Sequence, residues 1–367
     1  MHFGIAETEE EKRAVYRLRY DVYVEEMGRY QTVADHNQRM LYEDCDEQSR
    51  ISYAALDGEV VATARITWGG DAPLPQRMID QYGLAPFLAE LPPSAIAVGE
   101  RAMVRPHLRG TDLLLKMMGR GMHFANENRI QLVFGDCEPH LLNLYLGLGQ
   151  RTYSKTNVNS AEAGYLVPLV LVIEDLDHMR SVKSPLLEYM HDFGADARIP
   201  ACIQRALADG SAVMSRAHTT PAAYWGEVHS ALSELEASRI AALDGFTEDE
   251  AARCLDKSSI IECQQGDRVL KKGGVARNLF VVLEGTLEVR DDDGVHAVLG
   301  AGDVVGEMAF LLERPRTRDV YAVTDGTRVL SLSEANLRKM IETDPAIAAH
   351  LLLNISKMLC LRILRER

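Results

Sequence analysis

The stretch VVGEMAFLLERPRTRDV, residues 304–320, decides how the last third of the chain is interpreted. It lies within a series of short predicted strands, residues 259–332, punctuated by glycines at positions 266, 273, 285, 294 and 302. Those glycines alone indicate only a small β-roll or barrel. The quoted stretch adds a short helix beginning at Glu307, whose first backbone N–H groups lack helical partners, and Gly306 lets a ligand approach them closely. Such an arrangement is typical of a phosphate-binding site.

Two charged side chains complete this predicted site. Arg316 can bind a cyclic phosphodiester through two N–H groups, and Glu307 can accept a hydrogen bond from a ribose hydroxyl. The residues resemble the phosphate-binding cassette of the cyclic-nucleotide-binding family, which reads Gly-Glu, a short helix, then Pro-Arg-Ser/Thr-Ala. The resemblance covers about residues 240–350 and implies cAMP or cGMP as an allosteric ligand. Its ligand-contacting positions correspond to Gly306, Glu307, Met308, Ala309, Arg316 and Thr317, with the amides of Met308 and Ala309 as phosphate donors.

Several alternatives stay open for this segment. Thr317 can serve an adenine or a guanine, so cAMP is favoured only by analogy with bacterial chains. Arg318 stands where the family usually has alanine. A β-roll that has kept its fold without a ligand would have Glu307 and Arg316 paired to each other. Because the chain stops at Arg367, where related transcription factors continue into a helix-turn-helix, a DNA-binding regulator is not expected.

The first part of the chain alternates helices and strands. Thr8 and Glu11 form a predicted capping box that starts a helix, and Asp57-Gly58 between two apolar runs predicts a tight hairpin. Further strands are predicted at residues 94–104, at residues 132–136 and near Leu166, and further helices at residues 110–128 and through Tyr145. The pattern predicts a mixed α/β domain.

Two segments of that domain carry a second resemblance. VRPHLRGTDLLLKMM, residues 104–118, lies at a junction from strand to helix, which can hold a pyrophosphate or phosphopantetheine arm, and NLYLGLGQRTY, residues 143–153, precedes a glycine turn and a strand. In this order and spacing they resemble the GNAT superfamily of N-acyltransferases, particularly its N-acyl amino acid synthase and acyl-homoserine-lactone synthase branches. The coverage is about residues 1–175. On the acceptor side, the residues that agree with these branches are Arg19, Tyr23, Asp46 and Arg65.

The resemblance implies direct acyl transfer from a thioester to an amine. Glu100 would deprotonate the ammonium, a backbone N–H near Met103 would stabilise the oxyanion, and Tyr145 would protonate the leaving thiolate. The residues expected to bind the acyl donor are Val104, Arg109, Gly110, Thr111, Asp112 and Leu113. Because the acid Asp112 would repel a pyrophosphate, a donor bound to an acyl carrier protein fits better than coenzyme A.

Plainer interpretations exist for the same residues. Glu100 and Arg101 could form only an ion pair with each other, Tyr145 could be a packing residue, and Arg19 with Tyr23 could form a solvated face of a helix. These alternatives have no catalytic consequence.

Composition excludes several classes of function. A formal net charge of -14 without a concentrated basic face argues against nucleic-acid binding. The charged N-terminus and the lack of a long apolar run predict a cytoplasmic protein with no membrane span. Six cysteines without C-x-x-C or finger spacing predict free thiols and no metal site.

Together these patterns predict a GNAT-like α/β domain at 1–175, a helical connector at 176–237 and a β-roll cyclic-nucleotide-binding domain with flanking helices at 238–367. The main hypothesis is an N-acyltransferase regulated by a cyclic nucleotide, with a small amine or amino acid as acceptor. A non-catalytic sensor that docks a partner, and a cAMP-regulated protein lysine acetyltransferase, are the alternatives. The final helix carries an apolar face, Ile347, Leu351, Ile355 and Leu359, which could pack on its own domain or make a homodimer.

Overall fold

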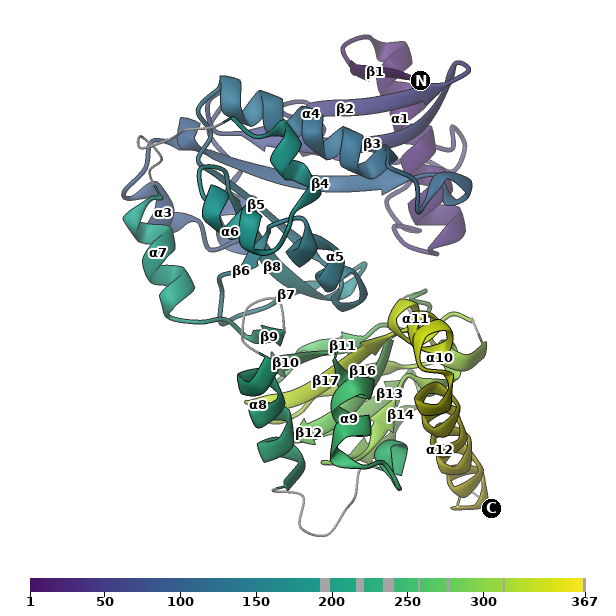
Figure 1. Cartoon of the computed structure of the whole chain (residues 1–367). Coiled ribbons are helices and arrows are strands. Elements are labelled where there is room, and N and C mark those ends of the chain that lie inside the picture. Colours follow the sequence, from purple (N-terminus) through teal and green to yellow (C-terminus); the bar gives the residue numbers. More distant parts are fainter. Residues whose placement is uncertain are drawn as a thin grey trace. The chain divides into compact units, whose positions relative to one another are not determined.

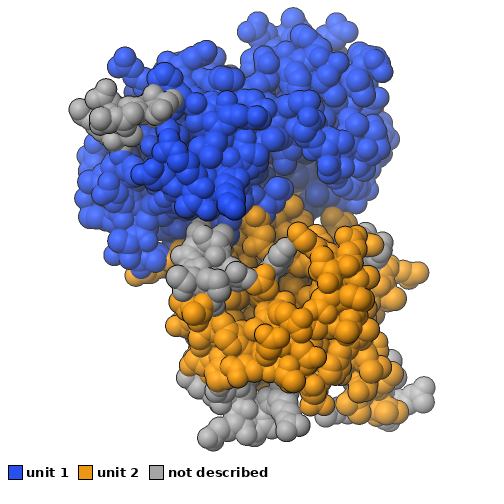
Figure 2. All heavy atoms as spheres, viewed as in Figure 1, with its two compact units in different colours: residues 1–137, 144–154, 168–210 blue, residues 138–143, 155–167, 211–367 orange. Residues whose placement is uncertain are grey.

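A computed structural model describes residues 1–191, 199–215, 221–233, 241–256, 258–275, 278–312 and 314–365. The chain divides into two compact units, coloured blue and orange in Figure 2. Unit 1 comprises residues 1–137, 144–154 and 168–210, and unit 2 comprises residues 138–143, 155–167 and 211–367. Residues 176–237, set apart above as a connector, form no compact unit of their own: the part up to residue 210 clusters with unit 1 and the part from residue 211 with unit 2. Residues 192–198, 216–220 and 234–237 of that segment lie outside the described residues.

Unit 1 is built on a mixed sheet with strand order β1-β2-β3-β4-β5-β8-β6 (Figure 1). Its strands are β1 (His2–Ile5), β2 (Arg50–Leu56), β3 (Glu59–Trp68), β4 (Ile96–Val104), β5 (Leu132–Cys137), β8 (Gly164–Val172) and β6 (Arg151–Thr152). The first four strands pair antiparallel in sequence, whereas β4 and β5 pair parallel. The predicted mixed α/β fold is therefore confirmed.

The helices of unit 1 follow the alternation of its strands. They are α1 (Glu9–Arg19), the π-helix η1 (Tyr20–Glu26), α2 (Gln76–Gln81), α3 (Ala85–Leu88), α4 (Leu113–Glu127), α5 (Leu142–Gly147), α6 (Leu176–Ser181) and α7 (Ala201–Ala208), with α5 crossing the boundary at residue 143. Tyr53 and Met103 pack in a cluster with α1, whereas their chain neighbours Ala54 and Val104 pack in another cluster with α4. Since successive strand residues point to opposite faces, α1 and α4 cover opposite faces of the sheet.

Local signals decide where several of these elements begin. The Thr8 side chain accepts from the Glu11 N–H while the Glu11 carboxylate accepts from the Thr8 N–H, which confirms the predicted capping box. Asp57 and Gly58 connect β2 to β3 with φ angles of 52° and 86°, as a two-residue hairpin turn requires. Both predictions rest on residues close together in the chain.

Unit 2 contains two antiparallel sheets with strand orders β15-β12-β17-β10-β9 and β11-β16-β13-β14, which confirms the predicted β-roll. Its strands are β9 (Val213–Ser215), β10 (Ser259–Cys263), β11 (Arg268–Leu270), β12 (Asn278–Glu284), β13 (Leu287–Asp291), β14 (Gly294–Leu299), β15 (Val304–Val305), β16 (Asp319–Ala322) and β17 (Thr327–Ser333). Its helices are α8 (Pro221–Ser233), α9 (Glu248–Leu255), α10 (Glu307–Leu312), α11 (Glu334–Thr343) and α12 (Pro345–Arg365). Within α12, Ile347, Leu351 and Ile355 are buried in the core of this unit, so this apolar face packs on its own domain.

A segment far away in the sequence completes unit 2. Residues 155–167 contain β7 (Val158–Ser160), which pairs with the first residues of β8. Asn159 Nδ2 donates to Asp267 Oδ1 over 2.6 Å, Tyr165 Oη donates to the Glu262 carbonyl over 3.1 Å, and Arg268 Nη2 donates to the Ala161 carbonyl over 2.8 Å. This segment is thus bonded to the β-roll through both side chains and backbone.

Candidate functional site

A bulge in β4 shapes the candidate site of unit 1. Arg65 of β3 lies opposite Glu100, and Thr63 lies opposite Met103, so β4 has one more residue than β3 between these two pairs. Arg101 adopts a φ of 57°, which is uncommon for a residue with a side chain. Neighbouring strand residues normally point to opposite faces, but at the bulge Glu100 and Arg101 both reach the same polar cluster.

The parallel pairing of β4 with β5 ends at this level. Their parallel pairing covers only Ile96–Val98 of β4 and Leu132–Phe134 of β5, although both strands continue further. Glycines stand where the pairing ends, and a Cβ on Gly135 would lie 2.9 Å from the Gly99 carbonyl oxygen. Among the described residues, β4 and β5 have no further paired positions beyond these. An extended, amide-containing ligand can bind to backbone groups of a strand that are left unpaired.

The predicted acceptor-side residues Arg19, Asp46 and Arg65 come together as a buried ionic group. Arg19 ends α1, Asp46 ends the short helix η2 (Asp44–Asp46), and Arg65 lies on β3. Arg19 Nη1 is 2.7 Å from Asp46 Oδ2, and Arg65 Nη1 is 2.9 Å from Asp46 Oδ1. Both arginines have a relative exposure of 0%, so the solvated helix face considered for Arg19 is wrong. Buried charges of this kind require partners, and Asp46 supplies one to each arginine.

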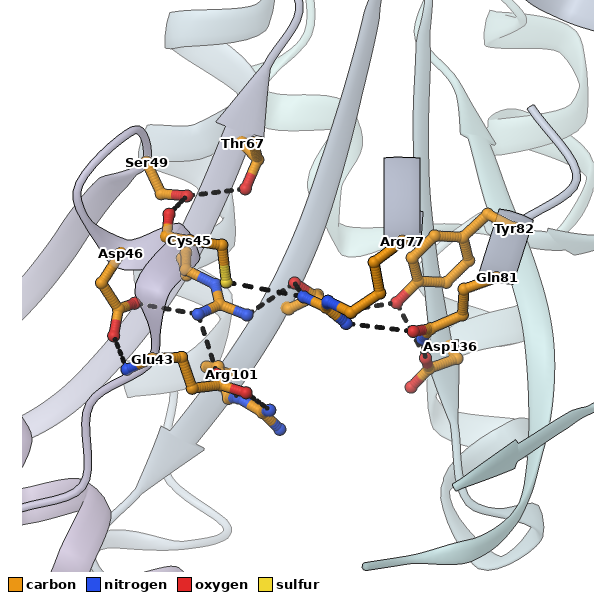
Figure 3. A network of polar contacts seen from close by, with 12 residues as sticks. Glu43, Cys45, Asp46, Ser49, Thr67, Arg77, Gln81, Tyr82, Arg101 and Asp136 are labelled. Carbon is orange, nitrogen blue, oxygen red and sulfur yellow. Dashed lines mark hydrogen bonds and ion pairs between the residues drawn. The ribbon is translucent and has the colours of Figure 1, made fainter. Parts of the chain in front are cut away.

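Glu43 extends this group to Arg101 (Figure 3). Its carboxylate accepts from Arg65 over 2.8 Å and from Arg101 over 2.6 and 2.7 Å. Arg101 in turn lies over the rings of Tyr23 and Tyr30, with distances of 5.4 and 5.0 Å to the centroids. Burial works against the charge of Glu43, but the two arginines outweigh it and lower its pKa to about 2.

Glu100 lies at the other end of the cluster. Its Oε2 accepts from Arg65 Nη2 over 2.7 Å, and its Oε1 lies 3.2 Å from Tyr82 Oη. Tyr82 is also 2.8 Å from Asp136 Oδ2 (Figure 3). Glu100 pairs with Arg65, and Arg101 pairs with Glu43. Each of the two residues therefore has an ionic partner other than its chain neighbour, unlike in the simple ion pair considered above.

Tyr145 lies on α5, half-buried, near the carboxyl end of β5. Burial raises the pKa of the Tyr145 phenol above its usual value, and Cys137, Tyr23 and Asp136 raise it further. A phenol in this environment keeps its proton and can donate a hydrogen bond. This property suits stabilisation of a leaving thiolate better than full proton transfer, which is most efficient when the pKa is near the working pH.

The predicted donor-binding residues form the turn between β4 and α4. Arg109 Nε donates to the Val104 carbonyl over 3.1 Å, Gly110 has a φ of 81°, and the Thr111 hydroxyl accepts from the Leu113 N–H over 3.4 Å. Asp112 is 2.7 Å from Lys116 Nζ. This ion pair partly neutralises Asp112, whose negative charge was the reason to expect weak binding of a pyrophosphate.

Sequence reasoning missed Glu43, Tyr82 and Asp136. Glu43 lies three residues before Asp46, and Asp136 lies at the end of an apolar strand, so both had a local signal. Tyr82, which follows α2, had no local sequence signal. Its contacts are with Glu100 and Asp136, which lie 18 and 54 residues further along the chain.

The nucleotide cassette predicted from the sequence is assembled in unit 2. Gly306 precedes α10 with a φ of 89°, and a Cβ there would lie 2.5 Å from Arg316 Nη1. Met308 and Ala309 lie in the first turn of α10, where backbone N–H groups have no partner within the helix. Glu307 and Arg316 are both buried, with relative exposures of 7% and 5%.

Arg316 is held by backbone oxygens. Its Nη1 donates to the Gly306 carbonyl over 2.7 Å, and its Nη2 donates to the Asn278 carbonyl over 2.6 Å. Burial lowers the pKa of Arg316 to about 10, an effect that Glu307 partly offsets. Thr317 is exposed, and Arg318, the departure from the family pattern, lies 3.4 Å from Asp291. Arg318 is thus engaged in a surface ion pair.

Comparison with known proteins supports the assignment of the last third. Residues 260–344 match the family model for the cyclic nucleotide-binding domain, which confirms that prediction. Glutaminase 1 of Bradyrhizobium diazoefficiens is 32% identical over 123 residues, covering 33% of this chain and 20% of the relative. The type II regulatory subunit of cAMP-dependent protein kinase from Drosophila melanogaster is 39% identical over 61 residues, 16% of each chain. The chain spans a fifth or less of the length of these two relatives.

Two solved structures are each similar to part of this chain. A cyclic nucleotide-binding domain from Methylobacillus flagellatus is 21% identical with a TM-score of 0.33, covering 39% of this chain and 79% of that one. BjaI, described as a CoA-dependent acyl-homoserine lactone synthase, is 18% identical with a TM-score of 0.36, covering 55% of this chain and 92% of that one. Among the described residues, no helix is long and apolar enough to cross a membrane.

Proposed function

We propose that unit 1 transfers an acyl group from a thioester to an amine, and that a cyclic nucleotide bound by unit 2 controls this reaction. The observation that carries the first part is the position of Glu100 on the bulge of β4, just beyond the last pair of β4 with β5. A phosphopantetheine arm is extended and contains amides, so it can bind to backbone groups of β4 beyond its last pair with β5. Its thioester would then be near the carboxylate.

In the proposed reaction, Glu100 removes a proton from the ammonium of the acceptor. The free amine attacks the thioester carbonyl, and a backbone N–H near Met103 stabilises the oxyanion. The new C–N bond replaces the C–S bond as the nitrogen loses its second proton to solvent, and Tyr145 donates a hydrogen bond to the leaving thiolate, which takes up a proton from solvent. The amine recognised would lie near the buried group of Arg19, Asp46 and Arg65. The donor is an acyl group on coenzyme A or on an acyl carrier protein.

The test measures thiol release and the acylated product by mass spectrometry, with acyl-CoA and acyl-carrier-protein donors offered to a panel of amines and amino acids. Glu100→Gln should lower kcat roughly 10²-fold or more. Glu90→Gln, a change at an exposed residue of unit 1, is the matched control and should leave the rate unchanged. Turnover by Glu100→Gln at the wild-type rate would remove this residue as the base.

The proposed ligand of unit 2 is cAMP or cGMP, bound by the first turn of α10 and Arg316. We expect calorimetric titration to give heat with the wild type and none with Arg316→Ala. Arg318→Ala removes an exposed arginine only two residues away and should still bind. Equal binding by both variants would contradict the proposed role of Arg316.

Control of the reaction is tested on the full chain. The rate of acyl transfer should change when saturating cyclic nucleotide is added to the wild type, and should not change for Arg316→Ala. By linkage, an acyl donor whose affinity depends on the nucleotide must in turn alter nucleotide affinity by the same factor. An acyl-transfer rate and an acyl-donor affinity that do not change with the nucleotide would show that the two units act independently, and would contradict the proposed control.

A further inference from the structure

A tyrosine hydroxyl lies between two carboxylates in unit 1. Tyr82 Oη is 3.2 Å from Glu100 Oε1 and 2.8 Å from Asp136 Oδ2. A phenol has a single hydrogen and can donate it to only one of these oxygens at a time. The other contact brings two oxygens together and is stabilised only when a carboxyl group supplies the second proton. The three side chains therefore form a chain along which one proton can occupy either end.

The surroundings hold this chain in place. Tyr82 is buried, and its backbone carbonyl accepts from the Tyr153 hydroxyl over 2.7 Å. Arg65 Nη2 binds the other oxygen of Glu100 over 2.7 Å, and Gln81 Nε2 donates to Asp136 Oδ2 over 3.1 Å. Each member thus has a second bond that fixes its position, and the mechanism proposed above uses only Glu100.

We propose that Tyr82 relays to Asp136 the proton that Glu100 takes from the acceptor ammonium. This inference rests on the proposed acyl transfer. An N–H bond of the ammonium breaks and an O–H bond forms on Glu100; that proton then passes to Tyr82 Oη while the original Tyr82 proton moves to Asp136 Oδ2. The sequence ends with Glu100 ionised again, Tyr82 neutral and Asp136 neutral. Tyr82 and Asp136 are positioning residues that act through Glu100.

The electrostatics of Asp136 suit the end of such a relay. Burial raises the pKa of Asp136 to about 6, and the nearby charge of Glu100 adds to the rise. Arg101 and the hydrogen bonds from Tyr82 and Gln81 act in the opposite direction. An aspartate with this pKa is ionised and able to accept a proton at neutral pH, and it holds that proton more firmly than an ordinary aspartate.

The kinetic test compares pH profiles of kcat for the wild type, Tyr82→Phe and Asp136→Asn. In both variants kcat should fall roughly 10²-fold with little change in KM for the acyl donor. In the wild type kcat should rise with pH around pH 6, and this rise should be absent from both variants. Tyr53→Phe is the matched control, because it removes a hydroxyl that donates to another carboxylate, Glu11, over 2.7 Å. Variants that keep the wild-type kcat and the limb near pH 6 would overturn the relay.

A second readout does not depend on turnover. Difference infrared spectra of the full chain should show a carboxyl group that titrates near pH 6, that is absent in Asp136→Asn and that shifts to higher pH in Tyr82→Phe. If no acyl donor is turned over by the wild type, the proposed function fails, whereas the infrared titration still decides whether Tyr82 and Asp136 share a proton. A titration that Tyr82→Phe leaves unmoved would refute that sharing.

Discussion

Replacing Gly306 by alanine measures how tightly the nucleotide cassette is built. The added Cβ would lie 2.5 Å from Arg316 Nη1 and 2.7 Å from the Asn278 carbonyl oxygen, at a φ of 89°. The backbone conformation alone costs a residue with a side chain about 1–2 kcal/mol. Arg316 must also give up at least one of its two carbonyl partners, and a hydrogen bond from a charged group contributes about 1.5–3 kcal/mol. We expect Gly306→Ala to lower the free energy of unfolding of unit 2 by about 2.5–5 kcal/mol.

Gly266→Ala provides the matched control. Gly266 has a φ of 91°, but a Cβ there would meet no atom within 4 Å, so only the backbone cost of about 1–2 kcal/mol applies. Urea unfolding is followed by the fluorescence of Trp225, which packs against the core of unit 2, in a Trp68→Phe background that removes the signal from unit 1. Calorimetry with cAMP should show weaker binding by Gly306→Ala only. Equal losses of stability in the two variants would refute the constraint between Gly306 and Arg316.

The remaining predictions concern ionic groups and a helix cap. Arg65→Met should lower the free energy of unfolding of unit 1 by about 3–5 kcal/mol, because Glu100 loses its closer arginine and Asp46 and Glu43 each lose one of two; an unchanged urea midpoint would contradict this. The pKa of Glu43 lies at about 2, below its usual 4.5, so its ion pairs stabilise the fold above pH 4.5 and this stability is lost as the pH falls towards 2. Thermal melts should show a shallower acid limb for Glu43→Gln. The pKa of Asp136 is raised from 3.8 to about 6, so its contribution is complete below pH 3.8 and is lost as the pH rises through 6. The melting temperature of Asp136→Asn minus that of the wild type should therefore be larger at pH 8 than at pH 4. An equal difference at the two pH values would contradict the raised pKa. Thr247→Ala should cost about 1 kcal/mol in urea unfolding, since it removes the capping box with Glu250, and a loss close to zero would contradict that role.

Features that depend on neighbouring residues were predictable from the sequence. The Asp57-Gly58 turn needs two residues that tolerate a positive φ, and the Thr8 capping box needs a hydroxyl three residues before a glutamate, so both can be recognised from a few letters. The contact between Gly306 and Arg316 is local in the same sense, because these residues lie only ten positions apart.

The polar cluster of unit 1 was predictable only in part. Arg19, Asp46 and Arg65 were named through a family resemblance, but their mutual ion pairs depend on how α1, η2 and β3 pack. The bond between Tyr82 and Asp136 joins positions 54 residues apart, and nothing in the local sequence indicates that their side chains meet. Such contacts arise from the order of strands in the sheet, which short-range patterns do not specify.

The position of residues 155–167 in unit 2 affects the choice of fragments for expression. Asn159 and Tyr165 bind Asp267 and Glu262 within unit 2, yet they precede the family match by about a hundred residues. A fragment cloned from residue 211 onwards would leave Asp267 and the Glu262 carbonyl without these partners. Expression of the nucleotide-binding part alone would therefore need the hairpin of β7 and β8 supplied as a linked or separate peptide, and a domain boundary drawn on the sequence alone would miss it.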